Sequence, residues 1–372
     1  MSKKIIVVAG ARPNFMKVAP ILVELRRHPQ EFQPLLVHTG QHYDYQMSEV
    51  FFDELELSPP DIYLDVVRDH PNQQTADIIG KFDAVLERET PDLVLVVGDV
   101  TSTDSCALAT SKRDVPLAHV EAGLRSRDRR MPEERTRLVT DGLADLLFTY
   151  SDDADANLRA ENVPSECIFQ VGNVMIDTLF RFRQKAERSN ILDEIGVRPK
   201  EYVLATMHRP SNVDDPRALT GLLGAFAEIG KDVDIVFQLH PRTKDRIERF
   251  DLQSALETIP NVHLIGPQGY LDIVKLQENA RLALTDSAGI AEETTALQVP
   301  CLTLRENTER PVTIKQGSNQ LVGCQPQRVI EAARAALADR RASYPVPPGW
   351  DGRSAERLVN VLRKDIERRL RY

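Results

Sequence analysis

Three carboxylates occupy positions from which they could transfer a proton to or from a bound anionic ligand. Asp99 and Glu121 each follow a short apolar run, and Glu133 lies in the arginine-rich stretch 119–137. Neighbouring carboxylates raise one another's pKa and nearby arginines lower it, so such a group can be differentiated into acids and bases. A helix cap at Asp99 and a solvated charged loop around Glu133 are the structural alternatives. Composition alone leaves both interpretations open.

The loop after the first apolar run carries basic side chains at the start of a helix pattern. Pro13 suits an early helical position, and Arg12 and Lys17 could reach an anion at the helix N-terminus. The loop is not GxGxxG, so neither a dinucleotide site nor a nicotinamide cofactor is expected. An ordinary turn with exposed bases explains the spacing equally well.

Two further loops carry groups that could hold a nucleotide. His208 and Arg209 follow the run 202–206, and a histidine there could act as a general acid or hold a phosphate, although a lone histidine is more often structural. Ser287 and Gly289 open a helix where small residues allow close approach to a phosphate, and Glu293 could accept hydrogen bonds from a ribose diol. A capped helix start is the alternative, and the layout indicates a ligand class rather than a reaction.

The elements that must position these residues alternate between short apolar runs and helical patterns, which predicts parallel sheets covered on both faces. Eleven runs are too many for one doubly wound sheet. We therefore expect an α/β protein with two Rossmann-like domains, over residues 1–170 and 171–355. Ligands bind such sheets at the carboxyl ends of strands, so a cleft between the domains is the expected site. The runs span 5–9, 34–37, 93–97, 117–120, 146–149, 168–171, 202–206, 235–239, 262–265, 282–285 and 300–304.

Composition narrows the class of protein. The 372 residues carry a formal net charge of −9, which disfavours a nucleic-acid partner. The four cysteines are scattered without zinc spacing, so reduced thiols and no metal site are expected. A signal peptide or membrane span is not predicted, and we expect a cytoplasmic protein without membrane association.

Taken together, the motifs resemble the non-hydrolysing UDP-N-acetylglucosamine 2-epimerase family over nearly the whole chain. The pieces are weak singly but specific in order and spacing. They are GARPNFMKVAP, TGQHYDYQMSEVFF, VVGDVTST, HVEAGLRS, MPEERTR, VGNVMIDTL, MHRPSNVD, LHPR, LTDSAGIAEE, ENTERPV and WDGRSAERL. The resemblance implies a glycosyltransferase-B-like fold in which the last helix, 356–372, packs back on the first domain and residues 171–355 bind UDP. It also implies a homodimer.

The resemblance assigns roles by motif. It places Asp99, Glu121, Glu133 and His208 in the catalytic group. Substrate-binding positions are Arg12, Lys17, Arg209, Gln268, Ser287, Gly289, Glu293 and Arg310.

The family's chemistry explains why carboxylates and cations occur together. The C2 proton is not next to a carbonyl, so the family expels UDP from C1 as that proton leaves, forming a 2-acetamidoglucal to which UDP re-adds. A carboxylate must carry the proton, and cations must hold the diphosphate. The resemblance requires neither a metal nor another cofactor, and it implies a place in polysaccharide biosynthesis.

Because the chain departs from the family pattern at several positions, the identity of the sugar in its substrate is not determined by the resemblance. The chain has Asn14 where glutamate is usual, Thr136 in place of asparagine, and Ile273 at a commonly aromatic position. The segment after Gly40 carries extra residues relative to members with an allosteric substrate site, so allosteric activation is not expected. The alternatives are a hydrolysing 2-epimerase, a 2-epimerase of a UDP-diacetamido-uronate, a glycosyltransferase of the same architecture and a non-enzymatic nucleotide-sugar sensor.

Overall fold

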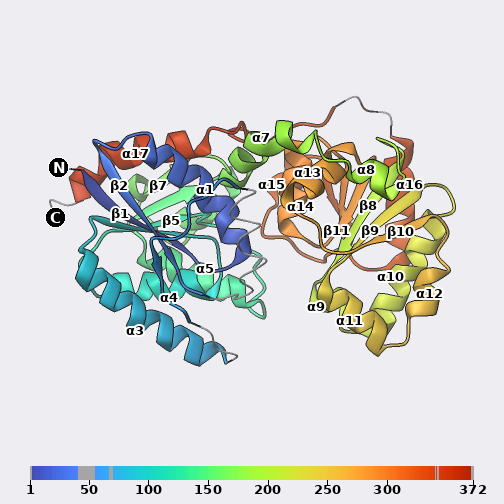
Figure 1. Cartoon of the computed structure of the whole chain (residues 1–372), viewed down its shortest axis with the longest axis horizontal. Coiled ribbons are helices and arrows are strands. Elements are labelled where there is room, and N and C mark those ends of the chain that lie inside the picture. The colour runs from blue at the N-terminus through green and yellow to red at the C-terminus, as the bar shows by residue number, and fades with distance from the viewer. Residues whose placement is uncertain (1, 41–54, 67–69, 340, 342, 370–372) are drawn as a thin grey trace. The chain divides into compact units, whose positions relative to one another are not determined.

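A computed structural model describes residues 2–40, 55–66, 70–339, 341 and 343–369. It contains two compact units, Met1–Arg181 with Pro348–Tyr372 and Phe182–Pro347, coloured by position in the chain in Figure 1. The sequence placed these boundaries at residues 170 and 356. The difference at the first boundary arises because helix α7 (Val174–Ala186) begins in the first unit and ends in the second.

The first unit is built on a parallel sheet of seven strands in the order β3-β2-β1-β4-β5-β6-β7. Strand β4 is entirely buried because helices cover both faces of the sheet. Helices α1 and α17 lie side by side on one face, and α3 and α4 cover the other (Figure 1). The strands are β1 (Lys3–Ala9), β2 (Phe32–His38), β3 (Ile62–Tyr63), β4 (Leu93–Val97), β5 (Leu117–Val120), β6 (Leu146–Thr149) and β7 (Ile168–Gln170).

The helices of this unit connect successive parallel strands of the sheet. Helix α17 packs on α1, and its first backbone amides, of Ser354 and Ala355, donate to the buried Asp177 carboxylate at 3.0 and 2.7 Å. The C-terminal helix therefore belongs to the first unit. The helices are α1 (Arg12–Arg26), α3 (Pro71–Glu89), α4 (Thr101–Thr110), α5 (Pro132–Leu143), α6 (Asp152–Ala160), the 3-10 turn Ser165–Cys167 and α17 (Ser354–Arg369).

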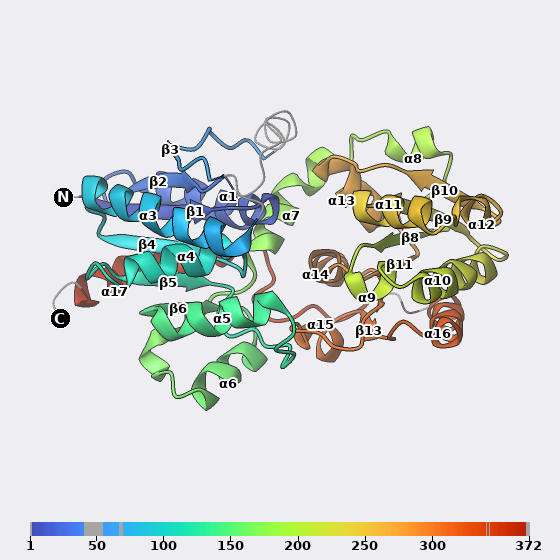
Figure 2. The same cartoon turned by 90° about the horizontal axis from the view of Figure 1, so that it is seen from below.

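The second unit repeats the arrangement with six parallel strands in the order β10-β9-β8-β11-β12-β13, seen from another side in Figure 2. The strands are β8 (Tyr202–Met207), β9 (Asp234–Leu239), β10 (Val262–Ile265), β11 (Leu282–Thr285), β12 (Cys301–Thr303) and β13 (Asn319–Leu321). The helices are α8 (Ile191–Ile195), α9 (Pro210–Val213), α10 (Pro216–Ile229), α11 (Pro241–Arg249), α12 (Gln253–Glu257), α13 (Tyr270–Asn279), α14 (Ala288–Ala296), α15 (Val312–Lys315) and α16 (Pro326–Ala338).

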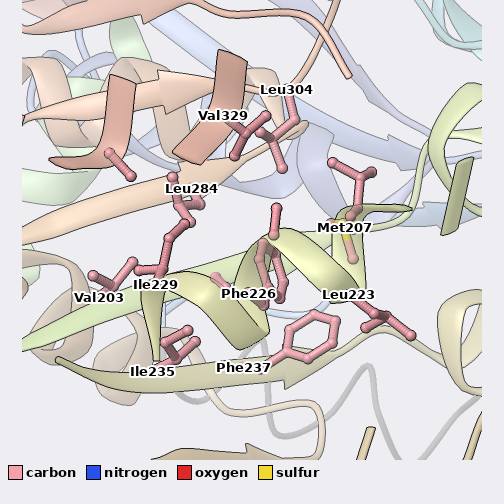
Figure 3. Packing of buried hydrophobic residues seen from close by; sticks show 14 of the residues in the cluster. Val203, Met207, Leu223, Phe226, Ile229, Ile235, Phe237, Leu284, Leu304 and Val329 are labelled. Atoms are coloured by element: carbon pink, nitrogen blue, oxygen red, sulfur yellow. The ribbon is translucent and has the colours of Figure 1, made fainter. Parts of the chain in front are cut away.

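The core of the second unit shows how local sequence builds an element. The Asp215 side chain caps α10 by accepting from the backbone of Arg217 at 2.7 Å. Residues on one face of α10 then repeat at helical spacing and are buried against the sheet. Phe226 of α10 meets Phe237 of β9 edge to face, with ring centroids 5.3 Å apart (Figure 3).

Both sheets have the doubly wound order, which confirms the predicted fold class of two Rossmann-like domains. The chain leaves β1 and β4, and likewise β8 and β11, in opposite directions along the sheet. Loops after such neighbouring strands diverge and open a crevice at the carboxyl edge. Two strands of the described residues were not predicted: β3 has only two residues, and β13 is polar, so neither carries an apolar run.

Candidate active site

In the first unit, Asn14 fixes the loop between β1 and α1. Its Oδ1 accepts from the backbone of Gly10 at 3.0 Å and of Ala11 at 2.9 Å, and its Nδ2 donates to the Val97 carbonyl at 3.3 Å. The amide thereby ties the end of β1 to the end of β4. The sequence marked Asn14 only as a departure from a family pattern, whereas the structure shows what the residue does here.

Lys17 and Glu121 form a buried ion pair at the same edge. Lys17 Nζ lies 2.5 Å from Glu121 Oε2, and the two residues are 5% and 3% exposed. Glu121 Oε1 is also buried, and it has no hydrogen-bond partner in the part of the chain that the structure describes. The structure therefore brings together two residues that the sequence had placed in different motifs, and leaves one carboxylate oxygen with unused accepting capacity.

Gly98 makes room for this pair. Its φ of +68° is in the left-handed region, and a Cβ built on it would lie 2.7 Å from Lys17 Nζ. A side chain at position 98 would therefore be both strained and in collision with the lysine.

Asp99 and Glu133 have different surroundings. Arg137, which is itself buried, forms an ion pair with the partly buried Asp99 and also lies 3.3 Å from Glu134. Glu133 is half-buried in the first turn of α5, whereas Glu134 is buried and accepts from the backbones of Ser126 and Arg127. Of the two consecutive glutamates, Glu134 therefore organises the loop.

A second buried network lies along β5 and α5. His119 Nδ1 is 2.6 Å from Asp141 Oδ1, and His119 Nε2 is 2.8 Å from the Gly98 carbonyl. Burial raises the pKa of Asp141, but the adjacent His119 and Arg125 more than offset this, so the pKa lies below its ordinary value. The only sequence signal for this network was the histidine and arginine flanking Glu121.

In the second unit, Asp286 at the end of β11 holds the loop after β8. Its carboxylate accepts from the backbone amides of His208 and Arg209 at 2.9 Å each, and from Asn212 Nδ2 at 2.9 Å. The His208 ring is oriented by the same group, with Nδ1 3.0 Å from Asp286 Oδ1. Burial raises the pKa of Asp286, but the hydrogen bond and charge of His208 and the backbone donors lower it overall. The sequence named His208 and missed its carboxylate partner.

His240 faces His208, with ring centroids 5.0 Å apart. His240 Nδ1 accepts from the backbone of Arg242 at 3.2 Å and so caps α11. Partial burial lowers the pKa of His240, and the adjacent His208 lowers it further. The two strand-end histidines, His208 and His240, therefore form one cluster beside Asp286.

Glu293 lies two turns into α14 in a hydrogen-bonded pocket. Its oxygens accept from Tyr270 Oη at 3.0 Å and from Gln277 Nε2 at 2.7 Å. Burial raises the pKa of Glu293 to about 7, although these two donors counteract the rise. Ser287 and Gly289, at the start of the same helix, are half-buried, which leaves the helix N-terminus accessible.

Arg310 belongs to a chain of buried charges beside α14. Its Nε lies 2.8 Å from Glu292 Oε1, it also pairs with Glu309, and Glu309 pairs in turn with Arg305 at 2.7 Å. Gln268 is half-buried before α13 and donates to the Gly266 carbonyl at 3.2 Å. Four of the predicted positions, Gln268, Ser287, Glu293 and Arg310, are thus arranged around α13 and α14.

Two predictions fall outside what the structure describes. The side chain of Arg12 and the segment 41–54, which includes the extra residues after Gly40, are not among the described parts of the chain. Within the described residues, no group of histidine, cysteine and acidic side chains has the geometry of a metal site. Nor is any helix in those ranges both long and apolar enough to cross a bilayer.

The comparisons with known proteins agree on one family. The family model described as UDP-N-acetylglucosamine 2-epimerase matches residues 23–363. A UDP-N-acetylglucosamine 2-epimerase homolog of Methanococcus maripaludis is 42% identical over 97% of this chain and 99% of its own. The UDP-2,3-diacetamido-2,3-dideoxy-D-glucuronate 2-epimerase of Pseudomonas aeruginosa is 40% identical over 90% of this chain and 92% of its own.

The fold comparison points to the same relatives. The crystal structure of Methanocaldococcus jannaschii UDP-GlcNAc 2-epimerase in complex with UDP-GlcNAc and UDP superposes with a TM-score of 0.87. It is 38% identical and covers 96% of this chain and 99% of its own. Together with the doubly wound sheets, these matches show that the chain belongs to the UDP-N-acetylglucosamine 2-epimerase family and is an epimerase.

Proposed function

We propose that the protein interconverts UDP-N-acetylglucosamine and UDP-N-acetylmannosamine by eliminating UDP from C1 and adding it back. The observation that supports this most directly is the Lys17–Glu121 pair. A buried carboxylate with one oxygen committed to a lysine and the other without a partner among the described residues is suited to accept a proton from carbon and return it.

The other carboxylates complete the proposed proton chemistry. Inversion requires a proton to leave one face of C2 and another to arrive on the opposite face. Asp99, held by Arg137, and Glu133, in the first turn of α5, are the further candidates in the first unit. We propose that these three carboxylates divide the two faces between them.

The second unit supplies groups for the leaving UDP. We propose that the N-terminus of α14, at Ser287 and Gly289, binds the diphosphate, and that Glu293 accepts from the ribose hydroxyls. Arg310, Arg209 and Gln268 line the same proposed subsite, and Arg12 remains a predicted phosphate ligand. We propose that His208, whose ring contacts Asp286, donates a proton to the departing phosphate oxygen. None of these roles requires a metal.

Deuterium exchange tests the proposal. Incubation with UDP-N-acetylglucosamine in deuterated water should place deuterium at C2 of a sugar that is still joined to UDP. Absence of C2 exchange would rule out the reaction on this substrate. Accumulation of free UDP and N-acetylmannosamine in the same assay would identify a hydrolysing enzyme instead.

The relative from Pseudomonas aeruginosa favours a second substrate. That 40% identical protein is named for a UDP-2,3-diacetamido-2,3-dideoxy-D-glucuronate, so a modified uronate is the alternative substrate for this chain. Running the exchange assay on both nucleotide sugars and comparing kcat/KM separates the two. A homodimer and a cytoplasmic location remain predictions from the sequence.

A further inference from the structure

A carboxylate on α5 contacts the chain on both sides of Glu121. Asp141 Oδ1 lies 2.6 Å from His119 Nδ1, two residues before Glu121. Asp141 Oδ2 accepts from the backbone of Gly123 at 3.0 Å and lies 2.7 Å from Arg125 Nη1. Asp141 with His119, Gly123 and Arg125 is called the Asp141 clamp below. All of its side chains are buried.

The backbone of Glu121 needs such support. Its φ of +70° is in the left-handed region, which costs a non-glycine residue on the order of 1–3 kcal/mol. A strained conformation persists only when contacts on both sides determine it. The clamp provides these contacts, and His119 Nε2 also joins the turn to the end of β4 through the Gly98 carbonyl at 2.8 Å.

The hydrogen-bond pattern orients the ring of His119. The Gly98 carbonyl can only accept, so Nε2 of His119 must donate to it. The contact between Nδ1 and Asp141 Oδ1 then holds the ring in this orientation.

We propose that Asp141 is a positioning residue for Glu121, acting with His119 to hold the strained turn that presents the Glu121 carboxylate. The inference rests on the proposed proton-transfer role of Glu121. It assigns no contact between Asp141 and the substrate.

Two substitutions separate positioning from charge. Asp141→Ala removes the whole clamp. Asp141→Asn can keep it. The amide oxygen can accept from Gly123 and Arg125, and the amide Nδ2 can donate to Nδ1 of a neutral His119. The Nε2–H group of His119 then still donates to the Gly98 carbonyl. The asparagine variant therefore preserves the turn without the ion pair.

The expected result is a rescue by the conservative variant. Asp141→Ala should lower kcat for C2 exchange by roughly 100-fold, the loss expected from a misplacement of about 1 Å, with UDP affinity by calorimetry within about twofold of the parent. Asp141→Asn should recover most of kcat. If folded Asp141→Ala keeps the parental kcat, or if Asp141→Asn is as slow as Asp141→Ala, the proposal is wrong.

NMR of ¹⁵N-histidine-labelled protein gives an independent readout. The ring signals missing from His119→Gln identify His119. In the parent and in Asp141→Asn, Nε2 of His119 should carry a proton, as its hydrogen bond to the Gly98 carbonyl requires. A parent whose His119 is protonated on Nδ1 alone overturns the arrangement. This measurement and the Asp141→Asn kinetics test the proposal even if Asp141→Ala does not fold.

Asp177 supplies the matched control. Asp177, in α7, is likewise a buried carboxylate of the first unit, but it accepts from two backbone amides at the start of α17. Asp177→Ala should lower thermal stability without the selective loss of kcat. If the parent itself shows no C2 exchange with either nucleotide sugar, the proposed function fails, whereas parental exchange with an unaffected Asp141→Ala refutes only the positioning role.

Discussion

Lys17 Nζ lies 2.5 Å from Glu121 Oε2 in an ion pair that is almost completely buried, although 104 residues separate the two in the chain. The lysine balances the charge of one carboxylate oxygen, and the second oxygen has no partner in the described part of the chain. Removal of either partner of this buried pair should therefore have large and measurable effects.

Lys17→Met should destabilise the protein strongly. Removing one partner of a buried pair leaves an uncompensated charge, which costs about 3–5 kcal/mol in the free energy of unfolding. Urea denaturation should show that loss for Lys17→Met, and the double variant Lys17→Met with Glu121→Gln should recover part of it. C2 exchange should be abolished in both. Additive losses in the double variant would show that the two side chains do not interact.

Gly98→Ala should impair turnover through Lys17. The new Cβ would lie 2.7 Å from Lys17 Nζ on a backbone with φ +68°, so the lysine must move. Gly142→Ala is the matched control, because position 142 is in helix α5 and an added methyl group there would meet only open space. We expect Gly142→Ala to raise stability by up to about 1 kcal/mol and to leave kcat unchanged. Equal kinetics for the two variants would contradict the spatial role of Gly98.

Asp286→Asn should lower kcat through His208. The single amide oxygen can accept from the two backbone amides and Asn212, but the Nδ2 group that then faces His208 Nδ1 cannot accept from the ring. The imidazolium that would donate the proton therefore loses its acceptor. The loss should approach the roughly 100-fold expected for a general acid. Asp214→Asn is the control, because Asp214 pairs with Arg242 and Arg246 at the exposed surface. Steady-state kinetics of both variants measure the difference, and a parental kcat for Asp286→Asn would exclude the orienting role.

Glu293 should make stability depend on pH. Its pKa in the folded protein is about 7, against an ordinary value of 4.5, so the unfolded chain releases this proton first as pH rises. The carboxyl's contribution is therefore fully present below about pH 4.5 and is lost as pH rises to about 7, a change of about 3 kcal/mol.

Glu293→Gln isolates this contribution. The difference in unfolding free energy between the parent and Glu293→Gln should fall across pH 4.5–7 and be constant above it. Denaturant titrations at several pH values measure it, and the subtraction removes the other titrating groups. A difference that is flat over this range would show that Glu293 titrates normally.

The sequence by itself determined the elements and the edge of the sheet at which chemistry occurs. Apolar runs such as 93–97 became buried strands because burial on both faces requires an uninterrupted apolar segment. Asp99, Glu121 and His208 follow strand ends, so their placement at the carboxyl edge needed no tertiary information. The same local logic missed β13, whose residues Asn319–Leu321 pair at the edge of the sheet without an apolar run.

Only the tertiary structure decided which side chains meet. The contact of Lys17 with Glu121 and that of His208 with Asp286 depend on strand order, which the periodicity of a single segment does not encode. The phase of α5 likewise decided that Glu134 and Asp141 face inward while Glu133 is half-buried. Partners far apart in sequence are chosen by the packing of whole elements, so local pattern could name the reactive groups but not the residues that hold them.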